Sequence, residues 1–185
     1  MELDKTIKER HSVRSFKETK KPSWEEVVKA IDAANYAPLA GNISTIRFIV
    51  VQDKEKLKQI AKACQQSFVA STGFIVVVCS DLTQLKRSYE DTAQKFSRQQ
   101  AGAAIQNFLL EITNLGLGSC WVGAFSEQQV KQILTIPDDI EVEAILPVGF
   151  EFEKKPKQRK RPDLDNVLYF DKWKNKFMLP QYKKE

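Results

Sequence analysis

Two arginines and a serine near the N-terminus could together bind an anion. Arg10, Ser12 and Arg14 are spaced two residues apart, and alternate residues of an extended segment face the same side. The planar guanidinium group of arginine matches a phosphate with two parallel hydrogen bonds. A segment of this kind, taken alone, is more often a solvated turn. The spacing therefore leaves both interpretations open.

A second basic cluster lies close to the C-terminus. Six lysines and arginines fall within residues 154–161, and subtracting them from the net charge of +5 leaves −1 for the rest of the chain. A nucleic-acid-binding domain usually spreads its basic residues over a face, so we expect no nucleic-acid partner. The run predicts either an exposed charged loop or, with the N-terminal arginines, one site for the terminal phosphate of a cofactor.

Two loop segments could approach a flat polar ligand. Residues 37–48 contain a proline–glycine loop that displays Asn42 and Ser44, although glycine and asparagine are also common in ordinary connections. Residues 115–123 combine small residues with an aromatic, which suits a planar ring lying close to the backbone. They are no dinucleotide fingerprint, because Trp121 occupies the third glycine position and the segment follows a helix.

Other kinds of chemistry find little support in the sequence. His11 is the single histidine, and no HExxH or GxxxxGK[ST] motif occurs. His11 and Ser12 cannot form a catalytic pair, because adjacent side chains diverge and no carboxylate is evident that would orient the imidazole. The three cysteines are far apart. They predict buried free thiols and a reducing cytoplasm, with neither disulfides nor a metal site.

The elements that must position these residues are helices and strands in one α+β domain. Helices are predicted over residues 3–10, from Ser23 to before Pro38, from Asp53 to 64, over 82–115 with a break near Gly102, and over 126–134. Capping boxes are predicted at Ser23–Glu26 and Ser126–Gln129. Strands are predicted over residues 48–51, 74–79, 121–122 and 141–146, of which the second should be buried on both faces.

The chain of 185 residues is long enough for one domain with a full core, and we predict a single domain with a C-terminal arm over about residues 163–185. The arm carries apolar side chains that should pack on something, and a second subunit is one candidate. The N-terminus lacks the apolar stretch of a signal peptide. The longest charge-free run, residues 63–80, is too polar to span a membrane.

The ordered set of segments resembles the nitroreductase-like FMN flavoproteins. The matching segments are Arg10–Phe16, Ala37–Asn42 with Arg47–Phe48, Gln106–Asn107 followed by Gly116–Gly123, and Leu146–Gly149 with the basic run after it. They span residues 10–161 in the family's order. The resemblance implies a nitroreductase-like α+β fold, with a central, mostly antiparallel sheet flanked by helices. It also implies an intertwined homodimer with two FMN sites at the subunit interface.

The resemblance also assigns FMN-binding roles to particular residues. The N-terminal motif would hold phosphate and the polar edge of the flavin, and the loop at residues 38–42 would reach the flavin from the other subunit. The segment at residues 121–123 would lie beside the ring, and the basic run would form a second phosphate clamp. The implied set is Arg10, His11, Ser12, Arg14, Pro38, Leu39, Ala40, Asn42, Gln66, Trp121, Val122, Gly123, Arg159 and Arg161.

The chemistry that the resemblance implies belongs largely to the cofactor. NADH or NADPH would reduce FMN, and a small oxidised molecule such as a nitroaromatic or a quinone would accept the electrons. Two departures leave the substrate pocket open: Ser44-Thr45-Ile46 stands where many relatives have Gln-Pro-Trp, and Gly123 where some have glutamate. The alternatives are a reductive dehalogenase or flavin-fragmenting enzyme, for which the chain has little room for an inserted lid, and a non-catalytic flavin-binding redox sensor.

Overall fold

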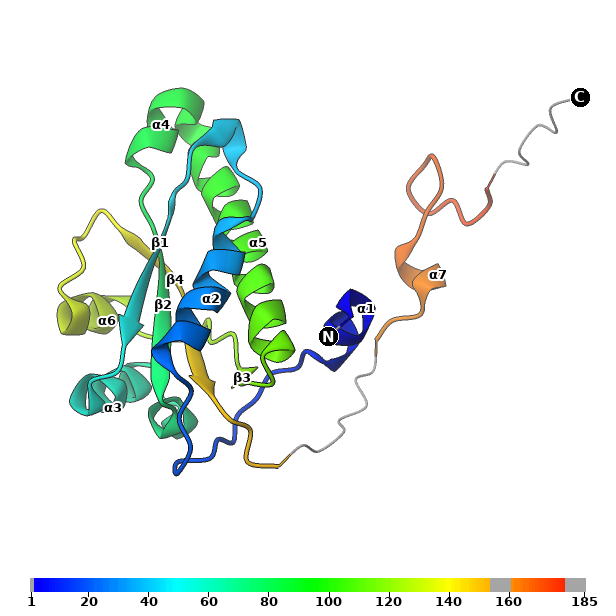
Figure 1. Ribbon diagram of the computed structural model, residues 1–185. Helices are drawn as coiled ribbons and strands as arrows, with labels where there is room; N and C mark the ends of the chain where they lie inside the picture. The colour runs from blue at the N-terminus through cyan, green and yellow to red at the C-terminus, as the bar shows by residue number, and fades with distance from the viewer. Residues whose placement is uncertain (1, 154–160, 179–185) are drawn as a thin grey trace, which may run out of the picture. The chain divides into compact units, whose positions relative to one another are not determined.

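The computed structural model describes residues 2–153 and 161–178. The chain divides into two compact units, Met1–Glu153 and Lys154–Glu185, and the first holds the sheet and most of the helices (Figure 1). Among the described residues, no helix combines the length and the apolar character needed to cross a lipid bilayer. The prediction of a single domain stays a prediction.

The first unit alternates helices with short strands. Its helices are α1 (Leu3–Glu9), α2 (Trp24–Asn35), α3 (Lys54–Ala63), α4 (Thr83–Tyr89), α5 (Ala93–Asn114) and α6 (Glu127–Leu134), with the single turns η1 (Ala40–Asn42), η2 (Ser67–Ser71) and η3 (Glu90–Thr92). Its strands are β1 (Ile46–Val51), β2 (Phe74–Ser80), β3 (Gly118–Ser119) and β4 (Glu141–Gly149). The second unit contains α7 (Leu164–Val167).

The four strands form one antiparallel sheet in the order β1-β2-β4-β3. Helices α2 and α5 cover one face and α3 and α6 the other (Figure 1). Each residue of β2 is buried, because alternate side chains such as Val76 and Val77 enter the two apolar cores on opposite faces. The predicted α+β fold and the predicted burial of this strand on both faces are confirmed.

Short-range signals fix several helix ends as predicted. Ser23 begins α2 with a capping box: its N–H donates to Glu26 Oε2 at 2.7 Å, and its Oγ accepts from Glu26 N at 3.2 Å. Asp53 caps α3 by accepting from Lys56 N at 2.9 Å. After α5, Gly116 takes a φ of 74°, which glycine adopts without strain. These ends are therefore set by local chemistry.

Two predicted boundaries along residues 82–122 are wrong. The long helical stretch breaks at η3, where Glu90 has a φ of 44°, and α5 runs without interruption through Gly102. Packing of α5 on the sheet outweighs the cost of about 1 kcal/mol for a glycine inside a helix. The strand predicted at 121–122 lies at Gly118–Ser119 instead, and Val122 makes only an isolated bridge with Ile145.

Three smaller expectations also fail. Strand β4 continues through Pro147 to Gly149. On β4, the two-residue β3 pairs with Val148 and Gly149, so no carbonyl of β3 needs a backbone N–H from Pro147. In the described chain, the Ser126 side chain caps no N–H of α6. The helical spacing predicts an apolar face of α2 made of Trp24, Val27, Val28, Ile31 and Ala34, but Trp24 and Val28 are exposed.

Candidate functional site

The N-terminal segment 10–17 lies along the edge of the sheet. Val13 N donates to Ser119 O at 2.9 Å, and Lys17 N donates to Phe150 O at 2.8 Å. Ser15 O accepts from Phe152 N at 3.0 Å. The backbone of this segment is therefore anchored to both β3 and the end of β4.

Two side chains of the same segment are buried against glycines. Val13 and Phe16 are buried. A Cβ added to Gly118 would lie 2.8 Å from Val13 Cγ2, and one added to Gly149 would lie 2.9 Å from Phe16 Cδ1. Neither position leaves room for a side chain, so the glycines permit the close approach. With Val13 turned inward, its neighbour Arg14 is exposed.

The predicted anion-binding residues Arg10, Ser12 and Arg14 lie near the buried thiol of Cys120. Burial raises the pKa of Cys120, while the charge of Arg14, a hydrogen bond with Ser12 and the charge of Arg10 act in the opposite direction. All three side chains are therefore close enough to act on one sulfur atom. Two guanidinium groups and a hydroxyl at one place form a donor set that fits a phosphate or another polar edge.

His11 is engaged with the protein through both ring nitrogens. Its Nδ1 lies 2.9 Å from Glu9 O and its Nε2 lies 2.9 Å from Glu151 Oε1. A carbonyl oxygen only accepts, so Nδ1 is the donor to Glu9. The side chain thus connects the N-terminal segment to the residues after β4, and its predicted contact with a flavin stays a prediction.

The segment after α5 offers a mixture of buried and open positions beside these arginines. Trp121 is exposed and Val122 is buried, and the Val122 N–H and C=O both pair with Ile145 at 3.0 Å. Around Gly123 an added Cβ would meet nothing within 4 Å in the described part of the chain. The buried Ser119 Oγ has no hydrogen-bond partner among residues 2–153 and 161–178. Open space and a buried unpaired hydroxyl fit a polar ligand here.

Gln66 lies at the entrance to η2, near the same edge. Its Nε2 donates to Cys64 O at 3.4 Å, and within η2 the ring of Phe68 stacks on Phe16 at 6.4 Å. Of the two residues chosen for the second phosphate clamp, the structure describes one. Arg161 is exposed in the second unit, and Arg159 lies outside the described residues.

The loop that carries Pro38, Leu39, Ala40 and Asn42 joins α2 to β1. Gly41 and Asn42 both take left-handed conformations, with φ of 56° and 57°, and the Asn42 side chain is exposed. The phenol of Tyr89, at the end of α4, lies directly over Gly41, because a Cβ there would meet Tyr89 Oη at 2.5 Å. The loop thus has a fixed shape and an outward-facing amide.

Within one chain, the loop and the arginines lie near different ends of α5. The loop reaches α5 where the Thr45 N–H donates to Gln100 Oε1, whereas the N-terminal segment bonds to Ser119, beyond the end of the helix at Asn114. At roughly 1.5 Å per residue, Gln100 lies about 20 Å from that end. Figure 1 shows the loop near α4 and the segment that follows α1 passing β3. The structure therefore does not bring the two groups of residues together in one chain.

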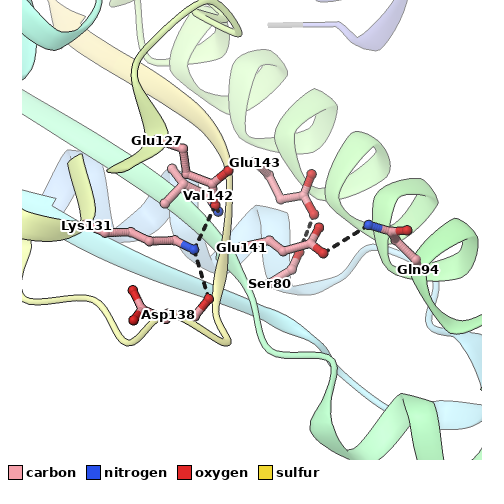
Figure 2. A network of polar contacts seen from close by, with 8 residues as sticks. All are labelled: Ser80, Gln94, Glu127, Lys131, Asp138, Glu141, Val142 and Glu143. Atoms are coloured by element: carbon pink, nitrogen blue, oxygen red, sulfur yellow. Dashed lines mark hydrogen bonds and ion pairs between the residues drawn. The ribbon is translucent and has the colours of Figure 1, made fainter. Parts of the chain in front are cut away.

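A polar network near α6 serves the fold (Figure 2). Lys131 Nζ lies 3.0 Å from Glu127 Oε1 and 3.1 Å from Asp138 O, and Glu127 also accepts from Val142 N at 3.0 Å. Burial raises the pKa of Glu127, but the bonds from Val142 and Lys131 outweigh it and the net pKa is lowered. The carboxylates of Glu127, Glu141 and Glu143 accept from protein donors, and among the described residues no group of three His, Cys, Asp or Glu could hold a metal ion.

Sequence reasoning missed a buried polar cluster beneath the loop. Thr45, Ser97 and Gln100 are buried and bonded to one another. A signal was present, because Ser97 and Gln100 lie at helical spacing within the apolar stripe of α5, where Ala101 and Ala104 face the core. Polar residues at positions that periodicity assigns to the core indicate a specific hydrogen-bonding role.

Comparisons with known proteins agree with this arrangement. The model of the nitroreductase family matches residues 7–73 and 65–150. A candidate NADH dehydrogenase/NAD(P)H nitroreductase from Archaeoglobus fulgidus is 32% identical over 156 residues, which cover 82% of this chain and 86% of the relative. An iodotyrosine deiodinase from Thermotoga neapolitana is 26% identical over 170 residues, 81% of this chain and 89% of the relative. The solved structure of an FMN-dependent nitroreductase from Clostridium difficile R20291 superposes with a TM-score of 0.77 at 26% identity, covering 91% and 98% of the two chains.

Proposed function

Because the chain belongs to the nitroreductase family, we propose that it is an FMN-dependent oxidoreductase that takes hydride from NADH or NADPH and reduces a small oxidised molecule. The observation that carries this proposal is the segment 10–17, whose backbone is bonded to Ser119 and Phe150 and which places Arg10, Ser12 and Arg14 near Cys120. The flavin, when bound, supplies the hydride and electron chemistry. The protein supplies charge, hydrogen bonds and a fixed position for the ring.

We assign the parts of the flavin to the groups described above. Arg10, Ser12 and Arg14 bind phosphate and the polar edge of the ring, with Arg159 and Arg161 as the second phosphate clamp. The backbone of residues 121–123 lies beside the ring, where Gly123 leaves open space. This assignment is supported by the unpaired Ser119 hydroxyl in the same segment, since a buried polar group normally has a partner.

The proposed enzyme is a homodimer in which each flavin contacts both chains. The separation of about 20 Å along α5 supports this, because Asn42 could then reach the ring only from a second copy. Exposed apolar side chains supply candidate contact surface on both units. They are Leu3 and Ile7 in α1, Trp24 and Val28 in α2, and Leu164, Val167, Trp173 and Phe177 in the C-terminal arm.

Nitroaromatics and quinones are the proposed electron acceptors, and a reductive dehalogenase is the second candidate. The similarity to the iodotyrosine deiodinase of Thermotoga neapolitana is the reason for keeping that alternative. Turnover of matched nitrated, halogenated and quinone substrates separates the two. A protein that is reduced by NADPH or NADH but turns over none of them would instead fit a flavin-binding redox sensor.

The three cysteines support a reducing compartment, which we propose to be the cytoplasm. Cys64, Cys79 and Cys120 are buried and free. Burial raises the pKa of Cys64 and the pKa of Cys79 to about 11. Thiols of this kind behave as small apolar side chains and persist where disulfides are disfavoured.

The identity of the cofactor tests the proposed function directly. The purified protein, reconstituted with FMN and FAD together, should release FMN on heating, because one compact group of arginines suits a terminal phosphate. Chromatography of the released flavin distinguishes the two. Reduction of the bound FMN by NADH or NADPH, followed by its absorbance, then tests the reaction. Uptake of FAD alone, or of no flavin, contradicts the proposal.

A further inference from the structure

Three polar side chains are buried together where α5 passes beneath the loop at residues 38–44. Thr45, Ser97 and Gln100 are 0%, 1% and 3% exposed. Ser97 Oγ donates to Thr45 Oγ1 at 2.9 Å. Thr45 N and Thr45 Oγ1 both donate to Gln100 Oε1, each at 3.5 Å. Thr45 is therefore bonded to α5 through its backbone and its side chain.

Stability alone does not explain why this cluster is polar. The two bonds to Gln100 are long, and bonds weaken with distance. The Gln100 Nε2 group is buried and has no hydrogen-bond partner among residues 2–153 and 161–178. Methionine has a similar volume and is apolar, as Ala104 and Phe108 on the same face are, and it would leave no unpaired side-chain amide there. The cluster therefore gives this part of the chain a defined geometry at a cost in stability.

Thr45 connects the loop to a further element. Its carbonyl oxygen accepts from Asp81 N at 2.8 Å, and Asp81 Oδ1 in turn accepts from Thr83 N at 3.0 Å, at the start of α4. The other end of α4 carries Tyr89, whose phenol lies over Gly41. One residue therefore fixes the end of the loop and the helix whose side chain covers it.

We propose that Thr45, Ser97 and Gln100 are positioning residues that hold the loop in the shape in which it presents Asn42 to the flavin of the second subunit. They touch no flavin and act through the loop. The inference rests on the proposed function for the identity of the ligand. The left-handed conformation of Asn42, with a φ of 57°, benefits from such support, because residues other than glycine adopt it less readily.

Thr72 supplies a matched control within the same chain. It is also buried, with 4% of its surface exposed, and its Oγ1 donates within its own turn, to Val69 O at 3.0 Å and Phe74 O at 3.1 Å. Thr72→Val and Thr45→Val make the same chemical change at similar burial. They differ in that the Thr72 bonds reach only residues two and three positions away, whereas the side-chain bonds of Thr45 join segments more than fifty positions apart.

The test compares full-length Thr45→Val, Gln100→Met, Thr72→Val and Thr45→Ser proteins loaded with FMN. FMN release after dilution, followed by the recovery of flavin fluorescence, should be about five- to tenfold faster in Thr45→Val and Gln100→Met, as the loss of one net hydrogen bond implies. Thr72→Val should release FMN at the wild-type rate, even if its melting temperature falls as much as that of Thr45→Val. Thr45→Ser, which keeps the hydroxyl, should restore slow release.

Amide hydrogen exchange separates this inference from the proposed function. Residues 38–44 should exchange faster in Thr45→Val than in Thr72→Val, with or without FMN. Unchanged exchange in that loop, or equal acceleration of FMN release by the two valine variants, overturns the positioning role even if the wild type binds FMN. A wild type that takes up no flavin, with a loop that loosens only in Thr45→Val, overturns the proposed function and leaves the positioning role standing.

Discussion

The N-terminal segment 10–17 and the loop 38–44 both carry predicted flavin-binding side chains, yet they are held in place differently. The segment is anchored by its backbone, through bonds to Ser119, Phe150 and Phe152. The loop is anchored through the buried side chains of Thr45, Ser97 and Gln100, with the Thr45 backbone bonded to one of them. Exposed side chains on the segment, such as that of Arg14, can therefore change without moving its backbone, whereas the shape of the loop depends on the identity of a few buried residues.

The largest effect is expected from breaking the proposed dimer, because this separates the segment of one chain from the loop of the other. A chain truncated after Pro162 loses exposed apolar side chains such as Leu164, Trp173 and Phe177, and burial of each contributes about 1.5–3 kcal/mol. We expect loss of the dimer together with its flavin. Light scattering and flavin content measure both. A control chain ending at Met178 keeps these residues and should stay dimeric.

Two outcomes would contradict the shared site. A chain truncated after Pro162 that stays dimeric and yellow shows that the arm is dispensable. A full-length monomer that retains FMN shows that the loop of a second copy is not needed, and the comparison between segment and loop then loses its basis.

Arg14→Ala should weaken FMN binding by roughly ten- to a hundredfold, as the loss of a charged hydrogen bond of about 1.5–3 kcal/mol implies. Lys172→Ala, an exposed lysine in the second unit, is the control and should have little effect. The melting temperature of the flavin-free protein should be unchanged in both, since the backbone holds the segment. Quenching of flavin fluorescence gives the affinities. Equal affinities would remove Arg14 from the site.

Gly118→Ala should lower the free energy of unfolding by about 1–3 kcal/mol, because the new Cβ would lie 2.8 Å from Val13 Cγ2. It tests the backbone anchoring, since Val13 must move away from Ser119. Gly123→Ala adds a methyl group where nothing lies within 4 Å in the described chain. Urea unfolding of the two flavin-free variants should therefore differ. Equal stability would show that the close approach at Gly118 is unimportant.

The last expected effects concern the thiols and appear only at high pH or on chemical labelling. Because burial raises the pKa of Cys64 and the pKa of Cys79 from 9.0 to about 11, the folded protein binds these protons more tightly than the unfolded chain. The stability they contribute is complete below pH 9 and is lost as the pH rises towards 11. Thermal melts across that range should show a progressive fall, and a flat profile would contradict it.

Cys120 should differ slightly from the other two thiols, because Arg14 and Arg10 favour its thiolate. We expect it to react first with iodoacetamide in the native protein at pH 8. Arg14→Ala should slow that reaction, since removal of the positive charge raises the pKa. Peptide mass spectrometry identifies the labelled residue. Faster labelling of Cys120 in the variant would show that Arg14 is not close to it.

Features set by neighbouring residues could be predicted from the sequence. The capping box at Ser23, the cap at Asp53 and the positive φ of Gly116 follow from local chemistry. The buried β2 follows from its uninterrupted apolar run. These features need no knowledge of the rest of the fold.

Features set by distant contacts could not be predicted in the same way. The short strand β3 lies at Gly118 because Val13, more than a hundred positions earlier, requires a glycine there. Gly102 stays helical because α5 is packed on the sheet. The family resemblance selected Arg10, Ser12 and Arg14, but it gave no indication of Gln100, which the departure at Thr45 makes important.

The position of β1 at the outside of the sheet has a consequence for handling the protein. Among the described residues, β1 pairs with β2 on one side alone, and Val50 on this strand is exposed. Such edges can recruit strands from other chains and lead to aggregation. The exposed charge of Arg47 is the kind of gatekeeper that opposes this. Neutral substitutions at Arg47 should therefore lower the soluble yield of the protein more than its activity.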